Sequence, residues 1–206
     1  SVTVIGAVSP QGGDFSEPVT QNTKRYVRTF WGLDRALAYA RHFPSINWLT
    51  SYSEYADDLK PWYDEHVGPE FVNSRHQIAH LLQKESELME IVKLIGADIL
   101  PEDQKLVMET ARLIRVGFLQ QNAYHAIDTY VPLDKQLRMM ELILKLYHGA
   151  RDIVSRAIPL SQLKATGIFE SLAKMKYEVP NDHQEKFDEY DKAIDEALRQ
   201  VNEANR

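Results

Sequence analysis

The chain has 206 residues, of which 44% are hydrophobic and 26% are charged, and its formal net charge is -6 at pH 7. Such a composition can bury one substantial core or two small ones and gives no reason to expect disorder. The absence of cysteine excludes disulfides, thiolate metal sites and a cysteine nucleophile, and it suits either a reducing compartment or, equally, a thermophile that avoids labile residues. The negative net charge argues against a nucleic-acid partner.

The sequence also lacks the features of a membrane-inserted chain. No apolar run reaches the roughly 18 to 20 residues that a membrane-spanning helix needs. The first residues do not show a basic segment followed by an apolar one, as a secretory signal does. We therefore expect any membrane association to come through partners.

The first third of the chain is predicted to hold strands and loops. Residues 2–8 form a β-branched apolar run typical of a buried strand, and residues 9–21 are rich in Pro, Gly and Ser, as loops are. Residues 26–31 are expected to form a second strand. Residues 33–41 carry Leu and Ala at helical spacing before Pro44 interrupts the pattern. Residues 1–70 are therefore expected to be the strand-containing end of an α/β domain.

From Pro69 onward, the hydrophobic spacing is helical. A long helix is expected to run through residues 78–95 and to end at Gly96, which can adopt the backbone angles of a C-cap. Pro101 is expected in the first turn of a second helix, where Glu102 and Asp103 would favour the positive end of the helix dipole.

Two further helices are predicted beyond the second. One begins near Leu133 and extends toward Ala157, because Pro159 ends the pattern. The last spans roughly residues 182–202 and has one apolar face. The fold class is therefore mainly α: residues 71–206 are predicted to form a helical C-terminal bundle that follows the α/β end at residues 1–70.

Two long segments of unusual composition carry a family resemblance. They are Gly-Ala-Val-Ser-Pro-Gln-Gly-Gly-Asp-Phe-Ser-Glu-Pro-Val-Thr at residues 6–20 and Phe-Pro-Ser-Ile-Asn-Trp-Leu-Thr-Ser-Tyr-Ser at residues 43–53. Together they closely resemble the catalytic A subunit of the vacuolar and archaeal (V/A-type) rotary ATPases. The resemblance extends to about Tyr130 and continues more weakly to the end. No G-x-x-x-x-G-K-[ST] phosphate loop occurs in the sequence, so the chain resembles the C-terminal part of a larger catalytic polypeptide.

The resemblance implies a function for the complete catalytic polypeptide. It implies ATP hydrolysis or synthesis at an interface with the B subunit, in a hexameric ring where A and B subunits alternate, coupled through a rotating shaft to proton or sodium transport. The complex would lie at the cytoplasmic face of a membrane, and the complete A subunit would bind ATP or ADP with Mg²⁺. Because the phosphate loop and the catalytic Glu would lie upstream, we expect no catalytic residue here, no activity of the chain alone and no tightly bound nucleotide.

Phe43 and Pro44 resemble the aromatic-Pro pair that places a ring against adenine in rotary ATPases. An aromatic ring suits this role, because a purine offers a flat face and stacking needs no hydrogen bonds. Taken by itself, an aromatic residue before proline more often serves packing, and the resemblance of the surrounding segment favours the adenine role.

A second adenine-binding segment is expected at residues 118–124, Phe-Leu-Gln-Gln-Asn-Ala-Tyr, which resembles the family's segment beside the base. Gln121, Ala123 and Tyr124 are the candidates. The β subunit of F-type ATP synthases has a Pro-Phe step where this chain has Asn122-Ala123, so the lining position is open by one or two residues. Simple capping of a helix end is the alternative interpretation.

Two further segments resemble parts that face the central shaft. Residues 96–104, from Gly96 to Gln104, sit between two amphipathic helices and resemble the helix-turn-helix that pushes on the shaft. Residues 12–18, from Gly12 to Pro18, resemble the loop that faces it. Without the resemblance, they would be an ordinary helical hairpin turn and a flexible surface loop.

No metal site is predicted. His76 and His80 lie four residues apart, as in a two-His metal site, but no third ligand or base accompanies them. The alternative to the nucleotide function is a non-catalytic helical assembly or scaffold module with no nucleotide contact.

Overall fold

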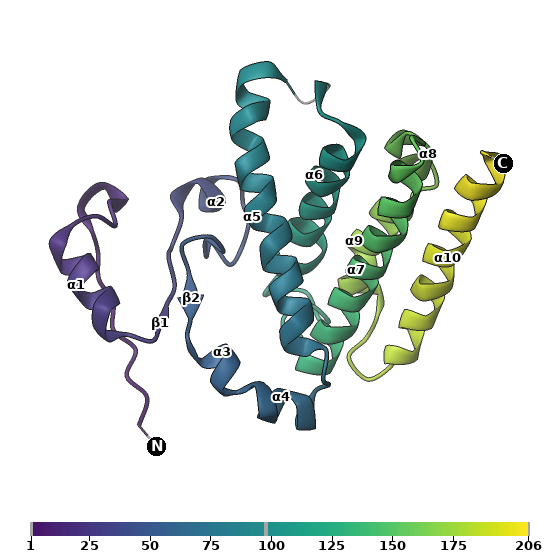
Figure 1. Ribbon diagram of the computed structural model, residues 1–206. Helices are drawn as coiled ribbons and strands as arrows, with labels where there is room; N and C mark the ends of the chain where they lie inside the picture. Colours follow the sequence, from purple (N-terminus) through teal and green to yellow (C-terminus); the bar gives the residue numbers. More distant parts are fainter. Residues whose placement is uncertain (1, 97–98, 206) are drawn as a thin grey trace. The chain divides into compact units, whose positions relative to one another are not determined.

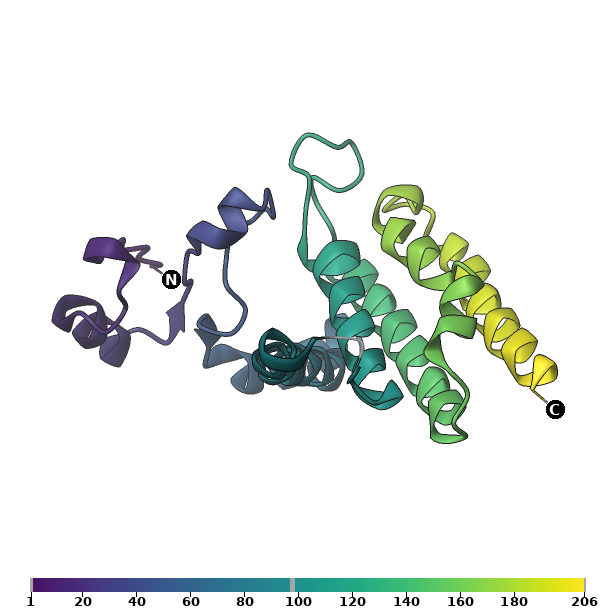
Figure 2. The same cartoon turned by 90° about the horizontal axis from the view of Figure 1, so that it is seen from above.

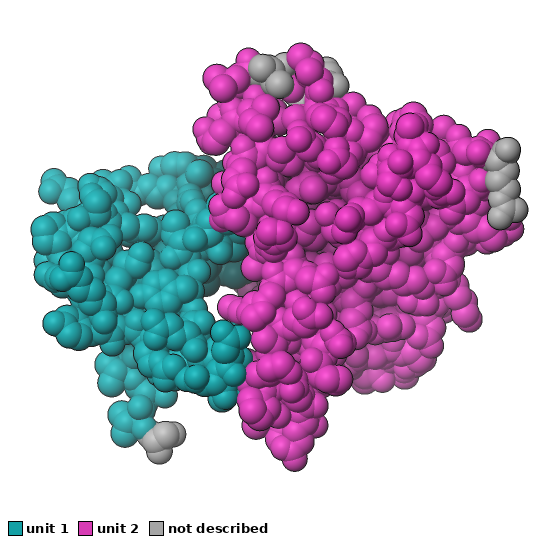
Figure 3. All heavy atoms as spheres, viewed as in Figure 1, with its two compact units in different colours: residues 1–59 teal, residues 60–206 magenta. Residues whose placement is uncertain are grey.

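The computed structural model describes residues 2–96 and 99–205, and the chain divides into two compact units, residues 1–59 and residues 60–206 (Figure 3). The first unit contains η1 (Gln11–Gly13), α1 (Pro18–Tyr26), β1 (Thr29–Phe30), α2 (Arg35–Tyr39), β2 (Tyr52–Ser53) and α3 (Tyr55–Asp58). Strands β1 and β2 pair antiparallel, with Thr29 opposite Ser53 and Phe30 opposite Tyr52 (Figure 1). The boundary predicted at residue 70 stays a prediction.

Local hydrogen bonds and aromatic contacts hold the first unit together. The ring of Phe30 lies 5.5 Å from that of Phe15, edge to face, and 6.0 Å from that of Tyr52, stacked. The Tyr52 hydroxyl donates to the carbonyl of Lys24 at 2.9 Å, which ties β2 to α1. Among the described residues of this unit, no hydrophobic side chain is fully buried.

Three predictions for the first unit need correction. Residues 2–8 form no strand, and Val2, Val4 and Ile5 are more than four-fifths exposed, because a strand needs a neighbour for its backbone groups and none of the described strands pairs with this segment. The expected loop gives way to α1 from Pro18, since Pro suits a first helical position and Glu17 accepts from the Val19 N–H at 3.2 Å. The second strand is limited to Thr29–Phe30. The helix expected within residues 33–41 is confirmed as α2.

The second unit is a helical bundle. Its elements are α4 (Lys60–His66), α5 (Phe71–Ile95), α6 (Glu102–Ile114), the π-helical turn η3 (Arg115–Leu119), α7 (Leu133–Ser155), α8 (Leu160–Ala165), α9 (Ile168–Glu178), η4 (Gln184–Lys186) and α10 (Phe187–Ala204). Helix α7 packs against α5 and α6 on one side and against α9 and α10 on the other (Figures 1 and 2).

Most of the predicted helix boundaries are confirmed. Helix α5 ends before Gly96, whose φ of 87° is a conformation that glycine tolerates best, and α6 begins directly after Pro101. Helix α7 starts at Leu133 and stops before Pro159. The last helix begins at Phe187, a few residues later than expected. Helices α8 and α9 were not predicted, because their apolar positions fall into two short runs separated by Gly167.

The core of the bundle is built from the inward faces of its helices. The side chains of Leu106, Ile114, Ile143, Phe169 and Ile194 are completely buried. The apolar face predicted for the last helix is confirmed, since Phe187, Tyr190, Ile194, Ala197 and Val201 are all buried where α10 packs on α7 and α9. The mainly helical fold class is therefore confirmed. None of the helices in the described ranges is both long and apolar enough to cross a membrane.

Candidate functional site

The turn that carries Phe43 is fixed to the start of α2. One carboxylate oxygen of Asp34 accepts from the N–H groups of Ala36 (2.7 Å) and Leu37 (3.3 Å), and the other accepts from the side-chain amide of Asn47 at 2.7 Å. The hydrogen bond from Asn47 lowers the pKa of Asp34, slight burial opposes it, and the two backbone bonds add to it. This carboxylate therefore joins both ends of the segment that surrounds Phe43.

Of the two adjacent rings on this turn, that of His42 is buried and that of Phe43 is exposed. His42 is buried, with its ring 5.5 Å from that of Trp48 and its backbone N–H donating to the Leu37 carbonyl at 2.9 Å. The peptide bond between Phe43 and Pro44 is cis, and the Phe43 side chain is 52% exposed. The anchored turn thus offers the Phe43 ring as an accessible flat surface.

The second candidate segment is a projecting loop, residues 120–131, between η3 and α7 (Figure 2). Its chain folds around Asp128, which is completely buried. The Asn122 N–H donates to Asp128 Oδ2 at 2.6 Å, and the Gln121 side-chain amide donates to the Asp128 carbonyl at 3.2 Å. His125 Nδ1 accepts from the N–H groups of Ile127 and Asp128.

The predicted residues of this loop differ in exposure. Gln121 is half-buried and its amide already holds the loop, whereas Ala123 is exposed and Tyr124 is fully exposed. Phe43 and Pro44 belong to the unit of residues 1–59, and these three belong to the unit of residues 60–206. Their shared role at one base stays a prediction.

Sequence reasoning missed a buried charged cluster beneath the loop, which consists of Asp128, Lys135 and Lys176. Lys176 Nζ donates to the carbonyl of Gln120, where the loop starts, and lies 4.0 Å from Asp128 Oδ2. Burial lowers the pKa of Lys176, and the charge of Asp128 opposes that shift. In the sequence, these are isolated charged residues in ordinary helical and loop patterns, so no signal marked them.

Lys135 closes the carboxyl end of α9. Its ammonium donates to the carbonyls of Lys176 (3.2 Å) and Val179 (2.7 Å) and to Asn181 Oδ1 (3.1 Å). A cation at this end of a helix meets unpaired carbonyls and the negative end of the dipole. Asn181 also donates to the Tyr130 carbonyl at 2.8 Å, so the same cluster holds the end of the loop.

Close packing brings α9 beneath the start of the loop. A Cβ at Gly117 would lie 3.0 Å from the Cα of Ala173, so only glycine lets η3 and α9 approach this closely. Lys176 lies one turn further along α9 and therefore reaches Gln120.

The hairpin of α5 and α6 was predicted to face a shaft, and Ala97 and Asp98 within residues 96–104 lie outside the described residues. Beside them, Leu94 is 85% exposed and Ile99 is 69% exposed. Glu102 accepts from the Leu160 N–H at 2.7 Å and from Lys105, and these bonds lower its pKa, with the backbone bond the larger cause. The hairpin is thus tied to α8 at the first residue of α6, close to its turn, and exposes the aliphatic side chains of Leu94 and Ile99 beside that turn.

In the loop of residues 12–18, the acidic side chains form hydrogen bonds with neighbouring residues of the chain. Gly12 and Gly13 have φ values of 69° and 78°, which the turn requires. Asp14 accepts from the Ser16 N–H at 2.9 Å, and Glu17 accepts from the Thr20 hydroxyl at 3.0 Å. Both carboxylates have these local partners.

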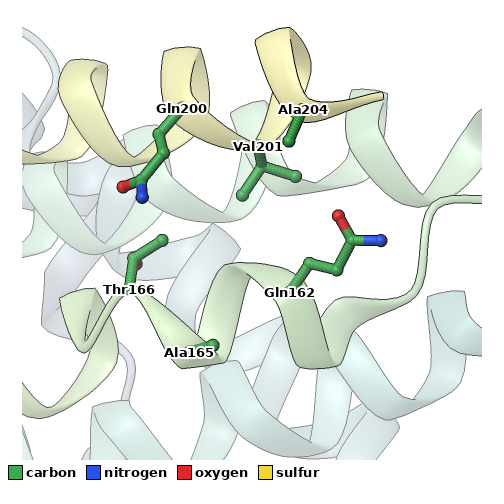
Figure 4. Close-up of a pocket in the computed structure, with 6 residues that line it drawn as sticks. All are labelled: Gln162, Ala165, Thr166, Gln200, Val201 and Ala204. Atoms are coloured by element: carbon green, nitrogen blue, oxygen red, sulfur yellow. The ribbon is translucent and has the colours of Figure 1, made fainter. Parts of the chain in front are cut away.

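A hollow of about 140 Å³ lies between α8 and α10 (Figure 4). Its lining consists of Gln162, Ala165, Thr166, Gln200, Val201 and Ala204. These side chains are uncharged, so the lining offers no titratable group for acid-base chemistry.

Comparison with known protein families agrees with this organisation. Residues 1–53 match the model of the ATP synthase alpha/beta family, nucleotide-binding domain, and residues 60–164 match that of the C-terminal domain of V and A type ATP synthase. The chain is 56% identical over 88% of its length to the V-type ATP synthase alpha chain 2 of Clostridium tetani. It is 49% identical over 98% of its length to the A subunit of the A-type ATP synthase of Methanopyrus kandleri.

The match of residues 1–53 to the nucleotide-binding-domain model and of residues 60–164 to the C-terminal-domain model places the chain in the ATP synthase class. Within that class, the chain belongs to the A (alpha) subunits of the V- and A-type ATP synthases and corresponds to their C-terminal region. The chain spans about a third of the length of these relatives, covering 31% and 34% of them.

Proposed function

We propose that this chain supplies the adenine-binding end of the nucleotide site and the helical lever of a catalytic A subunit that couples ATP hydrolysis or synthesis to rotation. The observation that carries the first part is the exposed Phe43 ring on its anchored turn. Most exposed aromatic rings on a surface turn would be free to move, but the contacts of His42, Asp34 and Asn47 hold this turn in place. A turn whose backbone is fixed before binding loses little entropy when a base stacks on the ring that it carries.

The residues fit the base of a nucleotide and not its phosphates. Phe43 offers a flat apolar face, and the loop tip at Ala123 and Tyr124 is open to a second contact. The sequence contains no phosphate-loop motif to hold phosphate oxygens or Mg²⁺. In the complete A subunit, the metal and the phosphates would be bound by residues outside this chain. We therefore expect the chain by itself to bind nucleotide weakly and not to hydrolyse it.

The lever role is supported by α5 and α6. Helix α5 has 25 residues, and a helix of that length extends roughly 37 Å. The two helices pack along each other, and Glu85 of α5 pairs with Arg115 just beyond α6. Exposed Leu94 and Ile99 near the turn provide an apolar contact surface for the shaft. A stiff hairpin with an apolar end can transmit a displacement as a rigid body.

Further partners are proposed from the family. Residues 2–8 carry exposed Val2, Val4 and Ile5, and we propose that they pair with a strand of the complete nucleotide-binding domain. B subunits would alternate with A subunits in the ring, and residues 12–18 would face the shaft. Transport of protons or sodium would occur in membrane subunits, and the ring would lie at the cytoplasmic face of the membrane.

The test of base binding follows backbone amide signals by NMR while adenosine, ATP with Mg²⁺ and tripolyphosphate are added separately to the chain. Adenosine and ATP are expected to shift the amides around Phe43, while tripolyphosphate leaves them unchanged. Phe43→Ala should abolish the shifts, and Tyr39→Ala, which removes another exposed ring of the same unit, should not.

The opposite result would contradict the proposed adenine role. If millimolar adenosine shifts no amide near Phe43, or if Phe43→Ala responds like the unmodified chain, the adenine role is wrong. The chain would then match the alternative, a helical assembly module with no nucleotide contact.

A further inference from the structure

The loop of residues 120–131 is exposed at its tip and yet held by completely buried charges at its base. Asp128 and Lys135 have no exposed surface and Lys176 is 1% exposed. Burying three charges costs far more than burying apolar groups, unless each charge finds a partner. Their arrangement therefore calls for an explanation beyond packing.

The partners of the three charges belong to the loop, to the end of α9 or to Asn181 just beyond it. Lys135 is satisfied by the last carbonyls of α9 and by Asn181. Lys176 Nζ lies 4.0 Å from Asp128 Oδ2 and pairs with its charge, and it also donates to the Gln120 carbonyl. Asp128 in turn accepts the Asn122 N–H at 2.6 Å through Oδ2.

These contacts fix the loop at the residue next to its exposed tip. Asn122 directly precedes Ala123, and its own side chain accepts the Tyr124 N–H at 3.0 Å. Lys176, Asp128, Asn122 and Tyr124 thus form a continuous series of polar contacts from the bundle core to the tip. The other carboxylate oxygen, Asp128 Oδ1, is buried without a hydrogen-bond donor among the described residues, so Asn122 and Lys176 are the contacts that define its orientation.

We infer that Asp128 and Lys176 are positioning residues, whose buried pair fixes the backbone of Asn122 and so sets where Ala123 and Tyr124 meet the adenine base. The inference rests on the proposed base-binding function of the loop. Neither residue needs to touch the nucleotide, because both act through the Asn122 backbone.

The first test needs no nucleotide and uses the unmodified chain. Amide exchange measured by NMR should show Asn122 protected about ten-fold relative to Ala126 of the same exposed loop, because its N–H is held by a buried carboxylate. Asp128→Asn, which keeps the shape and an acceptor oxygen but removes the charge, should lose most of that protection. Exchange in α7 should not change.

The second test uses the complete A subunit in its assembled ring and measures ATPase kinetics. Asp128→Asn and Lys176→Met should raise KM for ATP by about ten-fold, as expected when a stacking contact is weakened, and leave kcat within about two-fold. Inhibition by tripolyphosphate, which lacks a base, should be unaffected. The double variant, which removes both members of the Asp128–Lys176 pair, should be less impaired than the two single effects combined predict.

Matched controls separate positioning from general destabilisation. Asp191→Asn removes another lysine-paired carboxylate of the same bundle, 2.9 Å from Lys145, and should alter neither Asn122 exchange nor KM. Phe43→Ala tests the proposed function itself. If Phe43→Ala raises KM and the Asp128 and Lys176 variants do not, the positioning role is wrong while the base site stands. If Phe43→Ala has no effect on KM, the proposed base site fails, and unprotected Asn122 would overturn the positioning role by itself.

Discussion

The two units of this chain are stabilised in different ways. In residues 60–206, apolar faces from several helices meet in a core where Leu106, Ile143 and Phe169 are completely buried. In the described residues of 1–59, no hydrophobic side chain is buried to that degree, and the chain is held by caps, two-residue strands and aromatic contacts. Hydrophobic burial is the dominant source of folding free energy. The bundle is thus built to fold by its own core, and the first unit relies on local bonds.

This contrast suits the proposed division of work. A lever must keep its shape under load, which a dense core provides. A surface that joins other parts of a nucleotide-binding domain must instead leave apolar groups open, as Val4, Trp31 and Leu33 are.

The largest expected effect is in hydrogen exchange. Amides of α7 around Ile143 should exchange only when the bundle unfolds, whereas those of residues 2–8 should exchange near the rate of an unstructured chain, a difference of at least about a thousand-fold. Exchange detected by mass spectrometry would measure both. Equal protection of the two segments would contradict the comparison.

The second-largest expected difference between the units is in the free energy of unfolding lost when a leucine is truncated to alanine. Leu106→Ala is expected to lower the free energy of unfolding by about 2 to 5 kcal/mol, because it opens a cavity at a completely buried position. Leu33→Ala, at a side chain that is 73% exposed, should change it by less than about 0.5 kcal/mol. Urea unfolding followed by circular dichroism gives both values, and a large loss from Leu33→Ala would mean that the first unit has an apolar core after all.

The third-largest expected effect is the stability lost when a buried lysine is replaced, compared with a partly exposed one. Lys135→Met keeps the length of the side chain but leaves the carbonyls at the end of α9 without their donor, so we expect a loss of about 2 to 3 kcal/mol. Lys145→Met removes a half-exposed lysine that pairs with Asp191 and Asp195, and should cost less than about 1 kcal/mol. Thermal unfolding of both variants makes the comparison, and equal losses would show that burial does not set the strength of these contacts.

The smallest effect concerns the local bonds of the first unit. The pKa of Asp34 is lowered in the folded chain, so its carboxylate contributes stability at pH values above its unfolded-state pKa of about 3.9, and this contribution is lost as the pH falls through the lowered folded pKa. Trp48 fluorescence, which reports the turn beside His42, should therefore change on acidification below about pH 4. Asp34→Asn should remove that step, and Glu189→Gln, at the exposed face of α10, should retain it. A step that persists in Asp34→Asn would assign the transition to another group.

Much of the bundle was predictable because the spacing of apolar residues and the helix-ending residues are visible in the sequence. The spacing of apolar residues, Gly96 and the prolines at 101 and 159 predicted the end of α5, the start of α6 and both ends of α7 to within a few residues. The strand predicted at residues 2–8 was wrong, since a β-branched run shows a preference for extended backbone but cannot supply the neighbour that a strand requires.

The candidate site was only partly predictable. Phe43, Pro44, Gln121, Ala123 and Tyr124 came from resemblance, and their contact with adenine stays a prediction. Asp128, Lys135 and Lys176 were found only in the structure, because residues 41 or more positions apart in sequence meet there.

By itself, the sequence determined the family, the helical character of residues 71–206 and the absence of a phosphate loop, because motifs and hydrophobic periodicity are local properties of the chain. Only the tertiary structure decided which charges are buried, which rings stay exposed and how residues 120–131 are held. Burial and hydrogen-bond partnership depend on residues distant in sequence, and no local pattern encodes them.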